Sequence, residues 1–230
     1  MELPEPEAPT GEFLRALVAR RTHREFSGEV MPLTSLATLL RYTWGAMGTI
    51  DSPNFGPLLK KTSPSGGARH PAEVYVAALD VDGLAPGLYH YNHRDHVLER
   101  LRGGAMREEV LQHSLGQQHV GKASAVCYMT AVLPRTMYKY RAPRAYRIVA
   151  LETGHLAQTF CLVATWLGLA PFTTAAIVDT AIERALGIDG VNETILYVVG
   201  VGMPRTVNAS RAPAASRPPA SAGRKHRPRR

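Results

Sequence analysis

Two short segments carry residue types that can bind the two ends of a phosphorylated aromatic cofactor. Arg20, Arg21, Thr22 and Arg24 place three guanidiniums and a hydroxyl within five residues, and such a set can hold a phosphate through charge-assisted hydrogen bonds. Residues 62–67 read TSPSGG, a turn whose backbone N–H groups can approach a flat polar ring because glycine has no Cβ. On spacing alone, a positively charged helix end and an ordinary turn explain the two segments equally well.

In their order and surroundings these segments resemble the FMN-dependent nitroreductase superfamily. The resemblance is strongest to the SagB/McbC-type dehydrogenases, which oxidise thiazolines and oxazolines in ribosomally made peptides. It runs from about Phe13 to Pro204 and is carried by RRTHREF (20–26), TSPSGGARHP (62–71), GLYHYN (87–92), KY (139–140), ETGHLAQ (152–158) and VGMP (201–204). Several ordered motifs are more specific than any one of them.

The resemblance implies FMN as cofactor, with its phosphate bound by Arg20, Thr22 and Arg24. It places Arg21 near the ribityl chain or the ring, and Arg205, after the last predicted strand, becomes a second phosphate contact. For Arg205 the alternative is simply the start of a basic tail. No Gly-x-Gly-x-x-Gly fingerprint accompanies these residues, which favours FMN over a dinucleotide such as FAD.

For the flavin ring, the resemblance implies contacts from Pro64, Ser65 and Gly66, contributed by the partner subunit of a dimer. Ala175 and Ala176 stand where relatives often carry Gly-Gly over the other face of the ring, and their methyl groups narrow that approach. The chain also departs from its relatives after the turn. Relatives commonly continue with an apolar-aromatic pair, where this chain has Arg69-His70.

The pair Lys139-Tyr140 is the candidate for catalysis, because a Lys-Tyr pair in this stretch of the azoline dehydrogenases is implicated in removing a substrate proton. A phenol with an ordinary pKa of about 10 is a poor base at neutral pH, but nearby cations stabilise the phenolate. Four arginines crowd the same stretch, at positions 135, 141, 144 and 147. The alternative is a basic loop that binds an acidic peptide and performs no chemistry.

Two further patterns suggest metal ligands at first sight, and we expect no metal at either. His90, His93 and His96 recur at three-residue spacing, but a hairpin does not present such positions on one face. Glu152, His155 and Gln158 lie on a predicted helix in a single copy, whereas di-iron proteins use paired Glu-x-x-His motifs. Packing or hydrogen bonding across a dimer is the favoured explanation for the second set.

Hydrophobic periodicity predicts the elements that must position these residues. Helices are expected over 12–21, 32–44, 106–115, 146–167 and 180–186, and strands over 74–79, 123–133, 171–176 and 194–201. Two short strands around 92–95 form a hairpin over 87–101, while prolines, glycines and charge predict loops over 51–61 and 134–147. Alternating strands and helices indicate an α/β (α+β) sandwich in which helices flank a mixed sheet.

Composition divides the chain into a flexible N-terminus (1–10), one globular domain (11–206) and a disordered basic tail (207–230). Seven of the eight net positive charges lie in the last 23 residues, which leaves +1 on the rest and gives the folded body no sign of nucleic-acid binding. The acidic, proline-rich start is unlike a secretory signal, and no apolar run is expected to reach membrane-spanning length. Two cysteines in apolar segments favour buried thiols and a cytoplasmic location.

Together these observations predict an FMN-binding homodimer that oxidises azolines in a peptide, with synthetase or cyclodehydratase subunits as possible partners. Two alternatives stay open. One is an NAD(P)H-dependent reductase of nitro compounds, quinones or activated alkenes with the same fold. The other is a scaffold subunit that needs FMN only for its structure.

Overall fold

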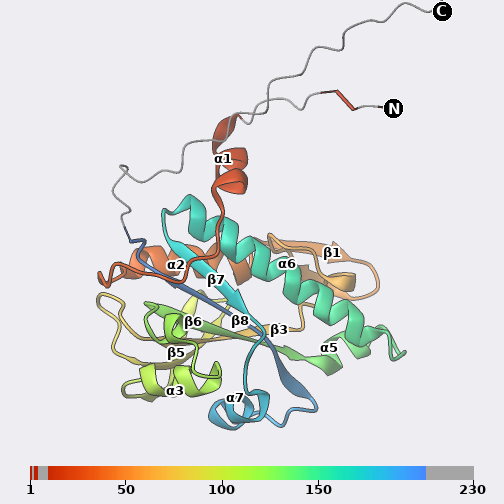
Figure 1. Ribbon diagram of the computed structural model, residues 1–230. Coiled ribbons are helices and arrows are strands. Elements are labelled where there is room, and N and C mark those ends of the chain that lie inside the picture. Colours follow the sequence, from red (N-terminus) through yellow and green to blue (C-terminus); the bar gives the residue numbers. More distant parts are fainter. Residues whose placement is uncertain (2, 5–9, 206–230) are drawn as a thin grey trace, which may run out of the picture.

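The computed structural model describes residues 1, 3–4 and 10–205, and its centre is a six-stranded sheet with helices on both faces (Figure 1). The strands are β3 (Ala72–Ala78), β4 (Gly87–Asn92), β5 (Val97–Gly103), β6 (Ala125–Val132), β7 (Ala170–Thr174) and β8 (Glu193–Gly202). Their order is β5-β4-β3-β6-β8-β7, and every neighbouring pair is antiparallel. The α+β sandwich is confirmed, but its sheet is antiparallel rather than mixed, because β3–β4, β4–β5 and β7–β8 join strands consecutive in the chain.

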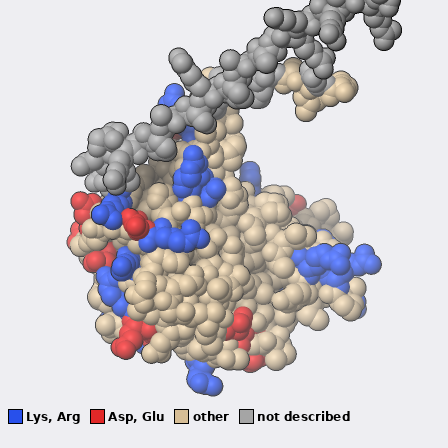
Figure 2. Space-filling model, in the orientation of Figure 1, with Lys and Arg blue, Asp and Glu red and all other residues tan. Residues whose placement is uncertain are grey.

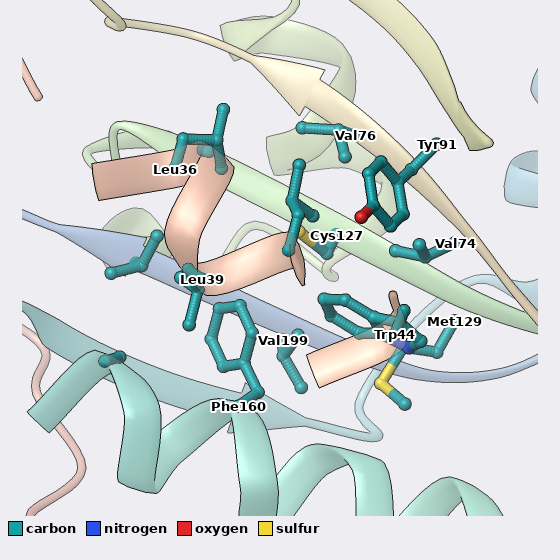
Figure 3. Close-up of a cluster of buried hydrophobic side chains, with 14 of the residues drawn as sticks. Leu36, Leu39, Trp44, Val74, Val76, Tyr91, Cys127, Met129, Phe160 and Val199 are labelled. Carbon is teal, nitrogen blue, oxygen red and sulfur yellow. The ribbon is translucent and has the colours of Figure 1, made fainter. Parts of the chain in front are cut away.

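Seven α-helices are described, with a short 3₁₀ helix, η1, in the turn at Gly66–Ala68. They are α1 (Gly11–Ala19), α2 (Leu33–Trp44), α3 (Arg107–His113), α4 (Gln118–Gly121), α5 (Leu133–Met137), α6 (Ala145–Trp166) and α7 (Asp179–Leu186). The helices α2 and α6 cover one face of the sheet, where Leu39, Trp44 and Phe160 meet side chains of the central strands (Figure 3). The rings of Trp44 and Phe160 lie 5.7 Å apart. On the other face, α3 and α7 contribute Val110 and Ile182 to a second buried cluster.

The long helix α6 crosses the sheet diagonally and connects the regions that matter for function (Figure 1). By length and composition it is the one helix in the described part of the chain that could cross a membrane, with a mean hydropathy of 1.2 over its most apolar window. The prediction that no apolar run reaches that length is therefore wrong. Of that window, 44% is buried in the fold, and the core helices of soluble proteins pass the same test.

Three segments form elements that the sequence did not predict. Residues 51–61, predicted as a loop, contain most of the hairpin formed by β1 (Thr49–Ser52) and β2 (Gly56–Leu59). The prediction failed because two prolines and a glycine in so short a segment favour a loop, although four residue pairs align across the hairpin. The predicted loop 134–147 contains most of α5, since Pro134 occupies a first-turn position that proline tolerates. The short helix α4 was not predicted.

The helix α1 also ends two residues before its predicted end at Arg21. The backbone of Arg20 is extended, and the Arg21 guanidinium turns back to donate to the Val18 carbonyl at 2.6 Å and the Arg20 carbonyl at 2.8 Å. The remaining predicted strands and helices are found within a few residues of their expected bounds.

Both thiols are free and buried, as expected, Cys127 in β6 and Cys161 in α6. The predicted flexible N-terminus lies mostly outside the described residues, and the predicted basic tail, 207–230, lies wholly outside them.

Candidate active site

The predicted phosphate-binding segment, 20–26, lies along the edge strand of the sheet. The His23 N–H donates to the Pro171 carbonyl at 2.9 Å, and Phe26 forms an isolated antiparallel bridge with Pro204. The bridge brings Arg205 to the same place, where its Nη1 lies 2.9 Å from Glu25 Oε2. The structure therefore brings the first predicted phosphate contacts and Arg205 together, from opposite ends of the domain.

Within this segment the arginines differ in what they contact. Arg21 donates to carbonyls at the end of α1. For this residue the structure therefore agrees with the alternative explanation, a positively charged helix end. Arg20 and Arg24 form no ion pair within the described part of the chain, and Thr22 is exposed. Two guanidiniums and a hydroxyl are thus available to an anion from outside.

The charges of Arg20 and Arg24 reach different neighbours. Burial raises the pKa of the Cys161 thiol to about 11, and the guanidinium of Arg20 opposes that rise. Burial lowers the pKa of His119, in α4, and Arg24 lowers it further. Arg20 therefore lies towards the C-terminal half of α6, while Arg24 lies towards α4.

The second predicted segment, Pro64 to Gly67, forms a tight turn that hydrogen bonds to itself. Ser65 Oγ accepts from the His70 N–H at 2.9 Å, and the Ser65 carbonyl accepts from the Ala68 N–H at 3.1 Å. Gly67 has a φ of 63°, and the non-glycine residues Ala68 and His70 have φ values of 54° and 45°. Left-handed backbone at non-glycine residues costs energy and is concentrated at functional sites.

Lys139 and Tyr140 lie directly against this turn. A Cβ built on Gly67 would come within 2.7 Å of Lys139 Nζ and 3.0 Å of Tyr140 Oη. A Cβ on Gly66 would come within 2.5 Å of the Ile148 side chain at the start of α6. The turn predicted to contact the ring and the pair predicted to perform catalysis, about 70 residues apart in the sequence, therefore meet in space.

Two ionisable groups lie behind the turn, and the sequence linked neither to it, since Glu152 was expected only to take part in packing or in hydrogen bonding across a dimer. Glu152 is 4% exposed, its pKa is raised by burial, and its Oε2 has no hydrogen-bond partner among the described residues. Ser65 and the Gly66 backbone lie close enough to oppose that rise. Burial lowers the pKa of Lys61 to about 8. Glu152 comes from α6 and Lys61 from the segment after β2, so no local pattern links them.

Phe55 is a further residue that sequence reasoning missed. It lies at the tip of the β1–β2 hairpin. The Lys139 ammonium lies 5.1 Å and the Arg69 guanidinium 4.9 Å from the centroid of its ring. These are cation–π distances. Because the hairpin was predicted as a loop, nothing in the sequence tied Phe55 to Lys139.

Ala175 and Ala176 follow β7 on the α4 side of the sheet and are exposed. The Gln117 side chain donates to the Ala176 carbonyl at 2.8 Å and to Thr174 Oγ1 at 3.1 Å, which fixes this segment. Gln117 precedes α4, the helix that contains His119 near Arg24. The segment 175–176 therefore belongs with the phosphate-binding residues and not with Lys139 and Tyr140.

The predicted site residues thus form two groups at opposite ends of α6. Gly66 lies against Ile148 and Arg20 lies near Cys161, which are separated by about 20 Å along a helix that rises about 1.5 Å per residue. Figure 2 shows basic side chains gathered in two places on this face, around the base of α1 and on the side where α5 lies. Within one chain, the predicted phosphate contacts and the predicted ring contacts therefore lie far apart.

The three histidines at three-residue spacing have three different surroundings. His90 Nε2 lies 2.8 Å from Glu73 Oε2, and this hydrogen bond raises the pKa of His90. His96 Nδ1 lies 2.7 Å from Tyr91 Oη. His93 lines a cavity, and burial lowers its pKa to about 4. Within the described residues, no three His, Cys, Asp or Glu side chains are grouped as metal ligands.

Comparison with known proteins gives one family. A model of the nitroreductase family matches residues 17–203. The trifolitoxin-processing protein TfxB of Rhizobium leguminosarum bv. trifolii is 32% identical over 163 residues, 69% of this chain and 44% of TfxB. Protein MJ1384 of Methanocaldococcus jannaschii is 32% identical over 188 residues, 82% of this chain and 90% of that protein. The microcin B17-processing protein McbC of Escherichia coli is 27% identical over 150 residues, 62% of this chain and 54% of McbC.

The chain therefore spans less than half the length of TfxB and about half that of McbC. Among solved structures, a protein of Anabaena variabilis superposes with a TM-score of 0.69 at 26% identity, covering 84% of this chain and 38% of that one. A chain of the E. coli microcin synthetase McbBCD complex, with truncated pro-MccB17 bound, has a TM-score of 0.66 at 22% identity, with 90% and 76% covered. A protein of Desulfovibrio desulfuricans in complex with FMN has a TM-score of 0.59 at 18% identity, with 90% and 94% covered. At 22% and 18% identity, the last two show the fold alone. With a family model across 17–203 and a relative 32% identical over 82% of its length, the chain belongs to the nitroreductase family.

Proposed function

We propose that this protein is an FMN-dependent dehydrogenase that oxidises peptide thiazolines or oxazolines to thiazoles or oxazoles. The contact between Lys139, Tyr140 and the Gly67 turn carries the proposal, because it places a candidate base beside the predicted ring contact. Similarity to TfxB and McbC, which process trifolitoxin and microcin B17, supports a peptide as substrate. Membership of the nitroreductase family supports an oxidoreductase.

The residues present fit FMN. Arg20 and Arg24 lack ion-pair partners in the described part of the chain, and Thr22 adds a hydroxyl beside them. At the Gly67 turn, even a methyl group would collide with Lys139 and Tyr140, so backbone and catalytic side chains are presented together. Pro64, Ser65 and Gly66 would face the ring, and Ala175 and Ala176 its other side. When bound, FMN supplies the acceptor for the hydride that leaves the ring CH₂ of the azoline.

The chain's own residues supply the proton chemistry. Tyr140 takes the Cα proton of the azoline, and the Lys139 ammonium, on the same side of Gly67, stabilises the phenolate. The buried carboxyl of Glu152, on α6, lies behind the turn, close to Ser65 and the Gly66 backbone. Loss of the Cα proton and of one hydride leaves the aromatic azole, lighter by about 2 Da, the mass of two hydrogens.

The two separated groups would each supply half of an FMN site, and we call them half-sites: one contains Arg20, Thr22 and Arg24, and the other contains the Ser65–Gly67 turn with Lys139 and Tyr140. We propose a homodimer in which the phosphate-binding group of one chain faces the Ser65–Gly67 turn of the other. Similarity to a chain of the McbBCD synthetase complex supports association with synthetase subunits. We place the protein in the cytoplasm, where its two buried thiols stay reduced.

The test compares Lys139→Ala and Tyr140→Phe with the flavin-loaded wild-type protein on an azoline-containing peptide. A general base commonly contributes about 10²–10⁴-fold, so both variants keep FMN and fold but leave the azoline unconverted in mass spectrometry. Tyr138→Phe is the matched control, since Tyr138 is 66% exposed and lies outside the contact with Gly67.

Three outcomes would count against this proposal. Full activity in the Lys139→Ala, Tyr140→Phe double variant at saturating peptide would remove the pair from catalysis. Rescue of the variants by high peptide concentration or low salt would show that the stretch only binds peptide. Rapid anaerobic bleaching of the flavin by NADPH would favour the reductase of the same fold.

A further inference from the structure

A cavity of about 410 Å³ opens beside the candidate catalytic pair, between the β1–β2 hairpin, the turn after η1 and the β4–β5 turn. Three arginines line it, Arg69, Arg94 and Arg135, together with His70 and His93.

The cavity carries excess positive charge. Of its three arginines, Arg135 is paired with a carboxylate, that of Glu73, whose other oxygen accepts from His90. Arg69 and Arg94 have no ion pair within the described residues. Burial lowers the pKa of both His93 and His70 to about 4, and the nearby Lys61 ammonium lowers both pKa values further. Both imidazoles are therefore neutral near pH 7 and leave the guanidiniums to set the charge.

Arg69 is held in place with part of its fork unused. Its Nε donates to the Gly67 carbonyl at 2.9 Å, and its Cζ lies 4.9 Å from the centroid of the Phe55 ring. Its Nη2 is buried and has no hydrogen-bond partner among the described residues. A buried donor without an acceptor is costly, and a guanidinium fork matches a carboxylate in geometry and charge.

The cavity also adjoins the proposed chemistry. Phe55 carries Arg69 and the Lys139 ammonium on its ring, and Arg69 is bonded to the carbonyl of Gly67, against which Lys139 and Tyr140 lie. The cavity is therefore close enough to Tyr140 for one peptide to reach both.

We propose that this cavity binds a carboxylate of the peptide substrate, either an acidic side chain near the azoline or the peptide's own C-terminus, and that Arg69 and Arg94 determine this specificity. The proposal rests on the proposed function and names the class of peptide it acts on. Arg69 provides the fixed fork next to the turn, while Arg94, on the β4–β5 turn, provides the second charge from across the cavity.

The experiment measures binding of short synthetic peptides by isothermal titration calorimetry to the flavin-loaded protein. Each peptide contains one thiazole, the product ring, so that turnover does not interfere. Four versions combine a Glu or Gln beside the ring with a free or amidated C-terminus, and they distinguish the two sources of the carboxylate. Wild-type protein is expected to prefer one acidic version by about ten- to a hundredfold, the range for charge-assisted hydrogen bonds.

Arg94→Gln should abolish that preference and leave the affinity for the neutral peptide unchanged. Arg69→Gln, which also loses the bond to the Gly67 carbonyl, should likewise abolish the preference. Arg100→Gln, which removes the same charge from the exposed strand β5, should keep it. Arg69→Lys retains charge without the fork, so an intermediate preference is expected from it even where Arg69→Gln fails to fold.

Equal affinity for acidic and neutral peptides, or no measurable binding of any, overturns the proposal. Loss of FMN from Arg69→Gln would assign the residue to the cofactor, and competition by NADPH that depends on Arg69 would assign the cavity to a nucleotide phosphate. Both results also overturn it. Failure of the proposed function would be distinguishable. Azoline-containing peptides would then lose no mass, while the thiazole peptides would still show the preference for a carboxylate.

Discussion

At the scale of single residues, the site depends on the absence of a side chain at Gly67. The backbone there has a φ of 63°, and a Cβ would overlap Lys139 and Tyr140. We predict that Gly67→Ala lowers stability by about 1 kcal/mol, the usual cost of a non-glycine residue at positive φ, and moves both side chains. Thermal unfolding and azoline turnover measure the two effects.

A matched control separates backbone cost from displacement. Gly83 has a φ of 71° with nothing within 4 Å of its added Cβ. Gly83→Ala should therefore lose similar stability and keep full activity. Equal turnover in both variants would mean that the contact with Gly67 does not position the catalytic pair.

At this scale the sequence indicated which residues could belong to the site, but not which of them lie in contact. The Ser65–Gly67 turn and Lys139-Tyr140 were predicted as separate site segments, and their contact depends on the fold around Ile148. Arg21 shows the limit, because the sequence gives three arginines within five residues the same chemistry. Which of them faces solvent is decided where α1 ends, and that boundary was predicted two residues late.

At the scale of elements, the sequence predicted helices and strands correctly where the periodicity of apolar residues is strong, and it missed them where that periodicity is weak. The helices α2 and α6 were predicted to within one residue at each end, since their apolar residues form continuous stripes against the sheet. The β1–β2 hairpin was missed because its residues are mostly exposed and show no alternation of buried and exposed positions. Phe55 and the Arg69 cavity depend on that hairpin, so neither could be predicted.

The outer face of α6 leads to a prediction about assembly. Leu151 is 58% exposed and Trp166 52%, and α1 adds Phe13 at 66%. Apolar side chains this exposed along two neighbouring helices favour a protein–protein contact. We predict that light scattering gives about twice the chain mass of 25.1 kDa, and that Leu151→Arg gives a monomer with little flavin.

Val191→Arg tests the specificity of that result, because Val191 is 72% exposed and lies in the turn before β8, on neither α1 nor α6. It should remain a flavin-loaded dimer. A stable wild-type monomer that retains FMN would contradict both the dimer and the shared site.

At the scale of the whole molecule, one long helix separates two groups of predicted site residues. The residues proposed to bind the phosphate gather by β7 and the end of β8, while those proposed to transfer the proton gather by η1 and α5. Neither half-site contains what the other would provide. In the proposed dimer, activity would therefore belong to the assembly, and a defect in one half-site would affect a centre that a second chain completes.

The separation of the half-sites along α6 has a genetic consequence. A chain carrying Arg20→Ala with Arg24→Ala and a chain carrying Lys139→Ala should each be inactive alone. If they are unfolded and refolded together, half of the dimers are mixed, and each mixed dimer contains one centre built only from unaltered residues. About a quarter of the wild-type turnover should return, as expected for random pairing in a two-fold dimer. Two dead alleles would then complement each other in one cell, whereas a centre built within a single chain would leave the mixture as inactive as its parts.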